Sequence, residues 1–262
     1  MLREIAEYPN SFGPIAPGGE RVETARFTLC MGVGSTWNTV QRHRFRAEEV
    51  DDVRAEVHTL LRARGRGQTQ WEVGSAAEPA NLVELLFERG VVPDRDPYAV
   101  ALVLRSEPRP GPSDAVARRV ETFEEFVAAS EVQFEAFETT GAELAEARAL
   151  LPQSWADHVH VMHAVWMDRR IVCAGTADPV SEGLLLYGGA TAPAARGRGA
   201  YRALLRARWD DAVALGTPAL ITQGGSMSRP ILERAGFEAI GHVHMLMDDF
   251  RERAQPDRPG LT

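Results

Sequence analysis

Cysteine and long apolar runs are both scarce in this sequence, and each scarcity excludes a class of protein. The 2 cysteines, Cys30 and Cys173, lie far apart without the spacing of a metal or redox motif, so we expect buried thiols in a reducing compartment. No stretch approaches the roughly 18 apolar residues of a membrane-spanning helix. The N-terminus carries acidic residues and lacks the apolar core of a signal peptide. We therefore expect a cytoplasmic protein without a membrane partner.

Lysine is missing as well, so arginine supplies all 29 basic residues, against 37 acidic ones. The net charge of −8 argues against a general nucleic-acid-binding surface, and arginine pairs are better interpreted locally. A chain of 262 residues can form one large domain or two modest domains with a proper core. Composition does not decide the assembly, and a homodimer stays open.

The stretch 183–205 has the most specific pattern in the chain. It begins with an apolar run typical of a buried strand, Leu184–Tyr187, and passes through small residues to the loop Arg196–Ala200. The apolar spacing after the loop predicts an amphipathic helix. The start of a helix offers free N–H groups and the positive end of its dipole to an anion, and Gly197 and Gly199 let the backbone approach one closely. With the two loop arginines beside it, this stretch is interpreted as a phosphate-binding loop.

The two common nucleotide fingerprints do not fit this loop. A P-loop needs a Lys-Ser/Thr pair after its last glycine, whereas Ala200-Tyr201 stands there. A dinucleotide-binding fold needs the loop in its first βα turn and an acidic residue about 20 positions later, and neither condition is met. Another kind of nucleotide-phosphate binder is therefore the weaker alternative.

The loop Arg196–Tyr201 resembles the acyl-CoA loop of the GNAT acyltransferase superfamily, Arg/Gln-x-x-Gly-x-Gly/Ala, which follows a strand and a turn like Thr191–Pro193. A second family motif, Gly236-Phe237 after the last predicted helix, stands in the right order. The resemblance spans about 119–250. It departs from the family at Tyr201, where Gly or Ala is usual, but a tyrosine still has a backbone N–H to donate.

This resemblance implies an α/β (α+β) fold: a mixed central sheet flanked by helices and splayed to admit the cofactor, preceded by a smaller α/β N-terminal domain. It implies acetyl-CoA as the cofactor and transfer of an acyl group to an amine. The residues expected to bind the coenzyme are Ala190, Thr191, Ala192, Arg196, Gly197, Arg198, Gly199, Ala200 and Tyr201.

The first 108 residues are expected to form the N-terminal domain, with a surface loop at 1–24. Periodicity predicts strands at 26–33, 68–73 and 97–105 and helices at 48–64 and 80–89. Scattered residues of this region resemble the half-domain of two-part GNAT proteins, and a plain helix packed on a sheet explains them equally well: Trp71–Gly74, Pro79, Leu82, Leu86 and Gly90. Arg64–Gly67 imitates the glycine loop, but it follows a helix and precedes a strand, so we interpret it as a turn.

A linker at 109–118 precedes the predicted acetyltransferase domain at 119–250, and a loose tail follows at 251–262. Patterns in the second half predict strands at 116–120, 158–167, 171–177, 218–223 and 238–247 and helices at 122–137, 141–150, 201–215 and 227–235. GNAT proteins usually end in two strands, whereas only 238–247 follows Gly236-Phe237. One hypothesis is that a strand from the N-terminal half completes the sheet.

The catalytic groups have a weaker signature. Many GNAT proteins have a tyrosine four residues before the terminal Gly-Phe glycine, and Leu232 at this position cannot donate a proton. Ser226 and Ser228 are substitutes by location, although helix capping explains them better. His242, with His244 on the same strand face, is a candidate base near neutral pH. Glu182 is a further candidate, and a solvated turn carboxylate is its plainer interpretation.

Three histidines, His158, His160 and His163, fall on one predicted strand. By the two-residue period of a strand, His158 and His160 share a face and His163 points to the other. No nearby carboxylate or cysteine completes a ligand set, so we expect no metal site.

Two functions remain open on this sequence. The first is an acetyl-CoA-dependent N-acetyltransferase that acts on an amine of a small molecule or a peptide. The second is a non-catalytic acyl-CoA-binding or regulatory protein of the same fold, motivated by Leu232 and the lack of an obvious base. Both would bind coenzyme A, and only the first would release its thiol when an amine is present.

Overall fold

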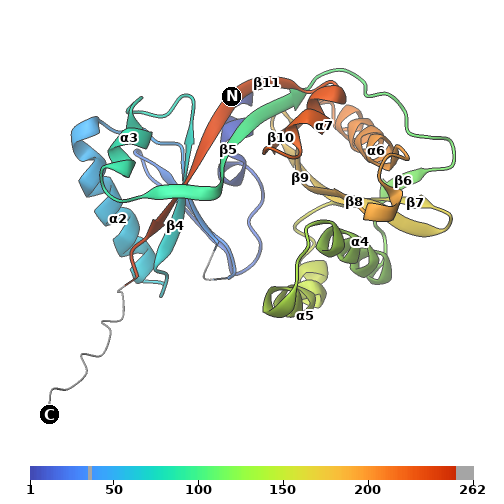
Figure 1. Cartoon of the computed structure of the whole chain (residues 1–262), viewed down its shortest axis with the longest axis horizontal. Helices are drawn as coiled ribbons and strands as arrows, with labels where there is room; N and C mark the ends of the chain where they lie inside the picture. The colour runs from blue at the N-terminus through green and yellow to red at the C-terminus, as the bar shows by residue number, and fades with distance from the viewer. Residues whose placement is uncertain (35–36, 252–262) are drawn as a thin grey trace, which may run out of the picture.

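The computed structural model describes residues 1–34 and 37–251, and the strands of these residues form one mixed sheet of eleven (Figure 1). Its order is β1-β2-β3-β4-β11-β5-β10-β9-β8-β7-β6. Most of the predicted tail, residues 252–262, lies outside the described residues. The N-terminal half supplies β1 (Glu20–Glu23), β2 (Thr28–Met31), β3 (Asn38–Gln41), β4 (Gln68–Gly74) and β5 (Val92–Leu104). The C-terminal half supplies β6 (Val116–Arg119), β7 (Met162–Met167), β8 (Arg170–Val180), β9 (Gly183–Thr191), β10 (Leu220–Gly224) and β11 (Glu238–Asp249).

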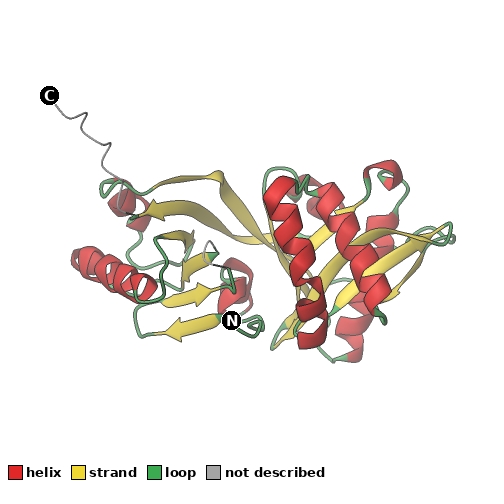
Figure 2. Cartoon of the chain, turned by 90° about the horizontal axis from the view of Figure 1, so that it is seen from below, coloured by secondary structure: helices red, strands yellow, loops and turns green. Residues whose placement is uncertain are grey.

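Helices cover both faces of this sheet, as Figure 2 shows from a second direction. In the N-terminal half α2 and α3 pack on β2, β3 and β4 around the buried Trp71 and Leu61. In the C-terminal half α6 and α7 pack on one face, while α1 and α4 pack on the opposite one. The helices are α1 (Leu2–Glu7), α2 (Val50–Arg62), α3 (Leu82–Phe87), α4 (Phe123–Ala136), α5 (Gly141–Asp157), α6 (Ala200–Ala214) and α7 (Arg229–Arg234). Three single 3₁₀ turns accompany them: η1 (Pro9–Ser11), η2 (Ala47–Glu49) and η3 (Pro193–Ala195).

The two halves exchange their last strands. Strand β5 leaves the N-terminal half to pair antiparallel with β10, from Val100–Gly224 to Leu104–Leu220. Strand β11 leaves the C-terminal half to lie between β5 and β4, and it is antiparallel to both. The hypothesis that a strand from the N-terminal half completes the sheet is therefore confirmed. The division at residue 108 stays a prediction, but the sheet runs across it.

Local sequence signals explain most of the element boundaries. Thr122 caps α4, because its hydroxyl accepts a hydrogen bond from the Glu125 N–H at 3.2 Å. The β7–β8 hairpin turns at Asp168 and Arg169, which both have positive φ. Gly90 and Gly236 adopt positive φ just after α3 and α7, as glycines at helix ends commonly do.

Three predictions were wrong, and two of them affect the site. Residues 1–24 are not only a surface loop: they hold α1, whose Ile5 and Ala6 are buried against β5, β9 and β10. A helix of six residues is too short for its periodicity to be recognised. The helix predicted at 141–150 does not end before Pro152: as α5 it continues through this proline to Asp157. The strand predicted at 158–167 begins only at Met162, because His158 takes a left-handed conformation with φ 49° that ends α5.

Candidate active site

Strand β9 leaves its neighbour β10 soon after it begins. The two strands are parallel and pair only at Leu184–Leu220 and Leu185–Ile221. Beyond these pairs β9 stays with β8 and β10 stays with β5, and the Thr222 hydroxyl bridges the start of the divergence by donating to the Leu186 carbonyl at 3.1 Å. The backbone of β9 from Tyr187 to Thr191 therefore lies where the sheet has opened.

The predicted phosphate-binding loop continues directly from this open strand. The turn η3 precedes Gly197 and Gly199, which have φ of 78° and 86°, and Gly199 is the N-cap of α6. A side chain at Gly197 would meet no atom within 4 Å, so a ligand has room to approach the backbone here. The first N–H groups of a helix have no partner inside it, and the first turn of α6 contains no acidic residue to compete with an anion.

The side chain of Tyr201 finds room beneath the loop rather than in it. It is partly buried against Gly189 and the core residues of α6, and burial raises the pKa of its hydroxyl. Glycine at 189 leaves space for this side chain, because a Cβ there would lie only 3.1 Å from the tyrosine ring. The departure from the family pattern at this position is thus accommodated by packing.

A bulge in β9 carries the backbone that faces the opening. The pairing with β8 shifts register between Ala174 and Thr176, opposite Gly188 and Gly189, and Gly188 has φ 56°. From α4, the Gln133 amide donates to the Gly188 carbonyl at 2.7 Å and so fixes the bulge on one face.

Arg208 supports the same region from the face of α6. Its guanidinium is fully buried against Gly175, and within residues 1–34 and 37–251 none of its three nitrogens has a hydrogen-bond partner. Burial lowers the pKa of this arginine. A Cβ at position 175 would overlap the guanidinium, so glycine is required in β8 at this point.

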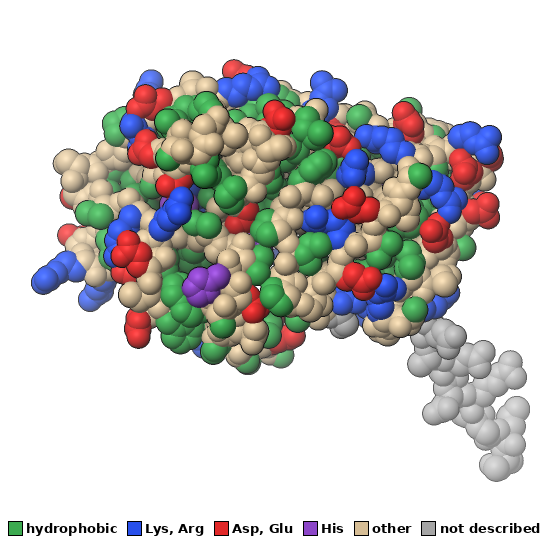
Figure 3. Space-filling model, turned by 180° about the vertical axis from the view of Figure 1, so that it is seen from behind, with side chains coloured by type: hydrophobic (Ala, Val, Ile, Leu, Met, Phe, Trp, Pro, Cys, Tyr) green, Lys and Arg blue, Asp and Glu red, His purple; other side chains and the backbone are tan. Residues whose placement is uncertain are grey.

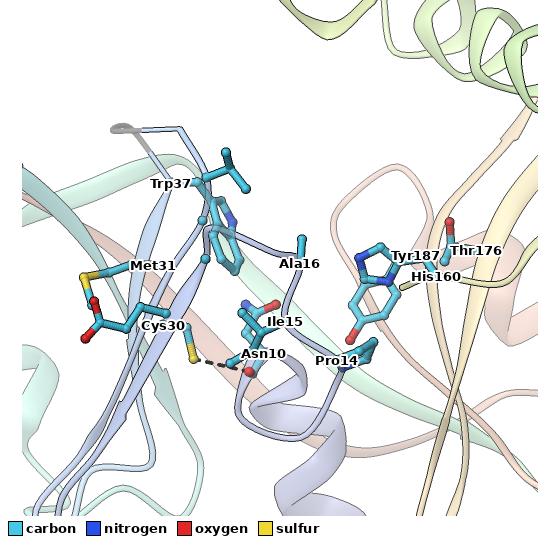
Figure 4. Close-up of a pocket in the computed structure, with 14 residues that line it drawn as sticks. Asn10, Pro14, Ile15, Ala16, Cys30, Met31, Trp37, His160, Thr176 and Tyr187 are labelled. Atoms are coloured by element: carbon cyan, nitrogen blue, oxygen red, sulfur yellow. Dashed lines mark hydrogen bonds between the residues drawn. The ribbon is translucent and has the colours of Figure 1, made fainter. Parts of the chain in front are cut away.

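A cavity of about 360 Å³ lies where the N-terminal half meets β8 and β9 (Figure 4). Tyr187 and Thr176, which are paired across β9 and β8, line one side of it together with His160. The N-terminal half supplies the other side, including Asn10, Cys30, Met31 and Trp37. In Figure 4 the Cys30 thiol and the Asn10 carbonyl, 3.2 Å apart, lie across the cavity from His160 and Tyr187.

His160 was not among the predicted catalytic residues, yet its imidazole lines this cavity and is hydrogen-bonded to a buried carboxylate. Its Nδ1 lies 2.6 Å from Oδ2 of Asp178, which is fully buried, and the other oxygen of Asp178 accepts the Val161 N–H at 3.2 Å. Both residues are visible in the sequence, but no spacing rule links His160, which lies on a bend, to Asp178, which lies near the end of β8.

Comparisons with known proteins support the fold alone. No family model matches the chain, and no curated protein matches it. Among solved structures it is similar to a GCN5-related N-acetyltransferase from Kribbella flavida, with a TM-score of 0.68, 16% identity and 95% of each chain covered. It is also similar to a tandem GNAT protein from the clavulanic acid biosynthesis pathway (TM-score 0.64, 13% identity, 95% of this chain and 89% of that one). A GCN5-related N-acetyltransferase from Sphaerobacter thermophilus matches with a TM-score of 0.60, 14% identity, 88% of this chain and 83% of that one.

The chain has the GNAT acetyltransferase fold.

Within this GNAT fold the predicted catalytic residues lie apart from the cavity. Ser226 and Ser228 are exposed in the turn before α7, and Ser228 occupies the N-cap position without a capping hydrogen bond from its side chain. His242 stacks on Tyr98 with ring centroids 5.8 Å apart, and it is paired with Val100, which packs toward α6 and α7. His242 is therefore on the face of the sheet opposite to Tyr187, which packs with α1. Their assignment as catalytic groups stays a prediction.

Leu232, which stands where the sequence resemblance predicts a tyrosine, belongs to the core. It is 3% exposed and packs with Leu102 and Phe237 in the cluster under α6 and α7. A side chain at this position is directed away from solvent, so the leucine has a packing role.

Acidic and basic side chains are interspersed on the face in Figure 3, which shows no broad patch of one sign. In the described part of the chain no group of three or more His, Cys, Asp or Glu side chains could hold a metal ion. No helix among the described residues is long and apolar enough to cross a membrane.

Proposed function

We propose that this protein is an acetyl-CoA-dependent N-acetyltransferase that acts on an amine of a small molecule or a peptide. The observation that carries the proposal is the continuous path from the open backbone of β9 through the glycine loop to the start of α6. The fold shared with GNAT acetyltransferases supports it. A cytoplasmic location belongs to the same proposal, and the two buried free thiols fit it. The proposed half-domain (1–108), linker (109–118) and transferase domain (119–250) are part of it as well.

The residues present fit an acyl-CoA molecule. The N–H groups of Gly197, Gly199, Ala200 and Tyr201 would bind the pyrophosphate at the helix start, beside the charges of Arg196 and Arg198. Arg198 lies 3.3 Å from Asp168 and 3.8 Å from Asp114, both exposed, so it can turn to a phosphate at little cost. Ala190, Thr191 and Ala192 would lie along the pantetheine arm. Bound acetyl-CoA supplies a reactive thioester.

The chain's own contribution to catalysis would come from preorganised groups around that thioester. Backbone N–H groups of β9 near its bulge would donate to the thioester oxygen, where negative charge develops as the amine attacks. The hydrogen bond from Gln133 and the packing of Tyr201 and Arg208 hold this backbone in place before a substrate binds.

Gly197→Glu is the sharpest test of the loop. A carboxylate at this open position would face the pyrophosphate, and we expect the Kd for acetyl-CoA to rise at least about tenfold, which corresponds to about 1.4 kcal/mol. Arg196→Glu should act in the same direction. Isothermal titration calorimetry with acetyl-CoA, ATP and NAD measures both effects and the preference for coenzyme A.

Gly65→Glu is the matched control, because Gly65 also has positive φ, 69°, and open space, but lies in the Arg64–Gly67 turn between α2 and β4. This variant should bind acetyl-CoA like the wild type. Equal binding by Gly197→Glu, Arg196→Glu and wild type would contradict the loop assignment. Thiol release in the presence of an amine then separates a transferase from a protein that only binds acyl-CoA.

A further inference from the structure

We propose that the cavity between the two halves binds the acceptor amine and that His160 is the base that takes its proton. This inference rests on the proposed function, and it adds to that function a site, a base and a class of substrate. It also gives the N-terminal half a direct part in the reaction.

The cavity lies on the correct side of β9 for an acceptor. Alternate residues of β9 point to opposite faces: Leu184 and Leu186 pack with α6, whereas Leu185 and Tyr187 pack with α1. The phosphate-binding loop leads into α6, so the coenzyme and the cavity approach the strand from opposite faces. Tyr187, which lines the cavity, directly precedes the bulge at Gly188 where β9 has left β10. An amine in the cavity would therefore reach the open strand without crossing the coenzyme.

His160 is oriented for proton transfer. Its Nδ1 is bound to Asp178, 2.6 Å away, and Asp178 is held in turn by the Val161 N–H. The Nε2 atom, on the other side of the ring, takes part in no hydrogen bond found among the described residues, and the side chain is 47% exposed. Figure 4 shows the imidazole beside Tyr187 at the wall of the cavity. A histidine fixed by a buried carboxylate is the arrangement that orients an imidazole as a general base. Asp178 is the positioning residue of this pair.

The lining selects an amine with an apolar or aromatic body. Trp37, which is 47% exposed, and Tyr187 offer aromatic surface, and Ile15 and Met31 add aliphatic surface. Among the residues that line the cavity, Glu20 is the acidic one, and the Arg64 guanidinium donates to its carboxylate at 2.6 Å. Aromatic rings favour an ammonium group, and a cavity of about 360 Å³ suits a small molecule. The class is a primary arylalkylamine.

In the reaction the amine arrives as an ammonium ion and gives one proton to Nε2 of His160. The amine nitrogen then forms a bond to the acetyl carbon while the bond from this carbon to sulfur breaks. His160 releases this first proton to solvent and then takes the second proton that the nitrogen loses. The departing sulfur takes a proton from solvent. The products are the N-acetylated amine, the coenzyme A thiol and one proton.

The test compares His160→Asn with His158→Asn in the full chain, using 2-phenylethylamine as acceptor. The asparagine amide at position 160 can still donate to Asp178 but cannot take a proton. We expect His160→Asn to lower kcat at least about 100-fold, with unchanged acetyl-CoA binding, and its rate to keep rising with pH where the wild-type rate is level. His158 is exposed, does not line the cavity and has a hydrogen bond to Ala156, so His158→Asn should retain wild-type kcat.

Binding of the amine without coenzyme gives a readout independent of turnover. In calorimetric titrations, Ala16→Trp, which fills the cavity from a loop, should weaken 2-phenylethylamine binding at least about tenfold and leave acetyl-CoA binding unchanged. His160→Asn should change amine binding less than about threefold. Spermidine, which lacks an aromatic body, should bind more weakly than 2-phenylethylamine.

The outcomes separate the two proposals. Wild-type kcat and pH dependence in His160→Asn would overturn the role of His160, and unchanged amine binding in Ala16→Trp would overturn the site. Failure of the wild type to bind acetyl-CoA would instead overturn the proposed function, and amine binding blocked by Ala16→Trp would still support the cavity as an amine site. Because the chain contains no lysine, acetylation of its own side chains will not contribute background thiol release in these assays.

Discussion

The two halves of the molecule have the same order of helices and strands, but they differ in what occupies the opening between two parallel strands. In the N-terminal half the order is β3, α2, β4, α3 and β5, and in the C-terminal half it is β9, α6, β10, α7 and β11. In each half the first two strands of this series are parallel and pair over only two positions, Thr39–Gln70 and Val40–Trp71 against Leu184–Leu220 and Leu185–Ile221. The same divergence of strands therefore exists twice.

Side chains fill the divergence in the N-terminal half. Gln41 at the end of β3 donates to the buried Glu72 of β4 at 2.7 Å and accepts from the Ser11 hydroxyl at 2.7 Å. In the C-terminal half the corresponding part of β9 carries Gly188 and Gly189, which leave the backbone accessible. One opening is closed by a hydrogen-bonded network, and the other is the opening in which we propose that the coenzyme binds.

The N-termini of α2 and α6 also differ in whether they could accept an anion. Before α2, the turn η2 carries Glu48 and Glu49, and Asp51 and Asp52 follow in the first turn of the helix. These carboxylates occupy the positive end of the dipole and would repel a phosphate. The start of α6 has Gly199 and no acid in its first turn. On the proposed function, the residues of the loop rather than the arrangement of strands distinguish the half that binds an anion.

The largest effect is expected from separating the halves. Fragments 1–105 and 106–262 each lose a central strand of their sheet, because β11 pairs with β4 and β5 pairs with β10. We expect neither fragment alone to show a cooperative thermal transition by circular dichroism, and the two co-expressed fragments to recover it. A protease site inserted at 109–112 is the control, since cleavage there should leave the folded complex intact. Cooperative unfolding of fragment 106–262 alone would contradict the strand exchange.

The next effect concerns the carboxylate that joins α2 to the exchanged strand β11. Asp248 is 1% exposed and accepts hydrogen bonds from Arg54 at 2.7 and 2.8 Å, and it lies 2.8 Å from Nε2 of His58. Burial alone would raise the pKa of Asp248, but these two partners outweigh it and hold the pKa well below its ordinary value. Asp248→Asn should lower the free energy of unfolding by about 3 to 5 kcal/mol at pH 7.

The stability that Asp248 contributes is expected to depend on pH. Because the folded-state pKa is depressed, the carboxylate stabilises the protein above about pH 4 and loses this contribution as the pH falls further. The difference between wild type and Asp248→Asn in urea unfolding should therefore shrink in acid. Asp249→Asn, at an exposed neighbour, should cost less than about 1 kcal/mol. An equal loss in both variants would show that Asp248 has no special role.

A smaller and opposite effect is expected from Glu72, which fills the opening in the N-terminal half. Burial raises the pKa of this carboxyl to about 7, although hydrogen bonds from Gln41 and Gln223 lower it in part. The folded protein then retains a proton that the unfolded chain releases above about pH 4.5, so its stability falls as the pH rises toward 7.

Glu72→Gln removes this loss while it keeps an acceptor for Gln41. At pH 8 we expect the variant to be more stable than the wild type by about 3 kcal/mol, and below about pH 4.5 the two should be equal. Thermal or urea unfolding across this pH range measures the difference. A variant that is less stable than the wild type at pH 8 would show that the charged form is preferred in the folded state.

Local patterns predicted the part of the candidate site that is continuous in sequence. The strand, the loop and the helix from Gly183 to Ala214 follow directly from an apolar run, glycines and helical spacing, and the structure has them in place. The interpretation of Arg64–Gly67 as a turn is also confirmed, since these residues connect α2 to β4. Their arginines make structural contacts: Arg66 donates to the Asn38 side chain at 2.6 Å and to the Gly32 carbonyl at 2.7 Å.

The rest of the site depends on contacts between distant residues, which no local pattern encodes. His160 and Asp178 become partners only because α5 ends at His158 in a left-handed conformation and leaves the next residues on a bend beside β8. The cavity exists because the short helix α1 and the loop after it lie between the halves. Leu232 was treated as a catalytic deficit on sequence, whereas its burial follows from packing against Leu102 of the exchanged strand β5.

The position of β11 also affects how the protein is made. Among the described strands it is the last to leave the ribosome, yet it lies at the middle of the sheet between β4 and β5. Until residue 249 has been synthesised, both of these strands have an unpaired edge of the kind that promotes association between chains. A nascent chain of this protein therefore stays incomplete in both halves at once, and a truncation that removes only β11 would damage the N-terminal half, whose own sequence is intact.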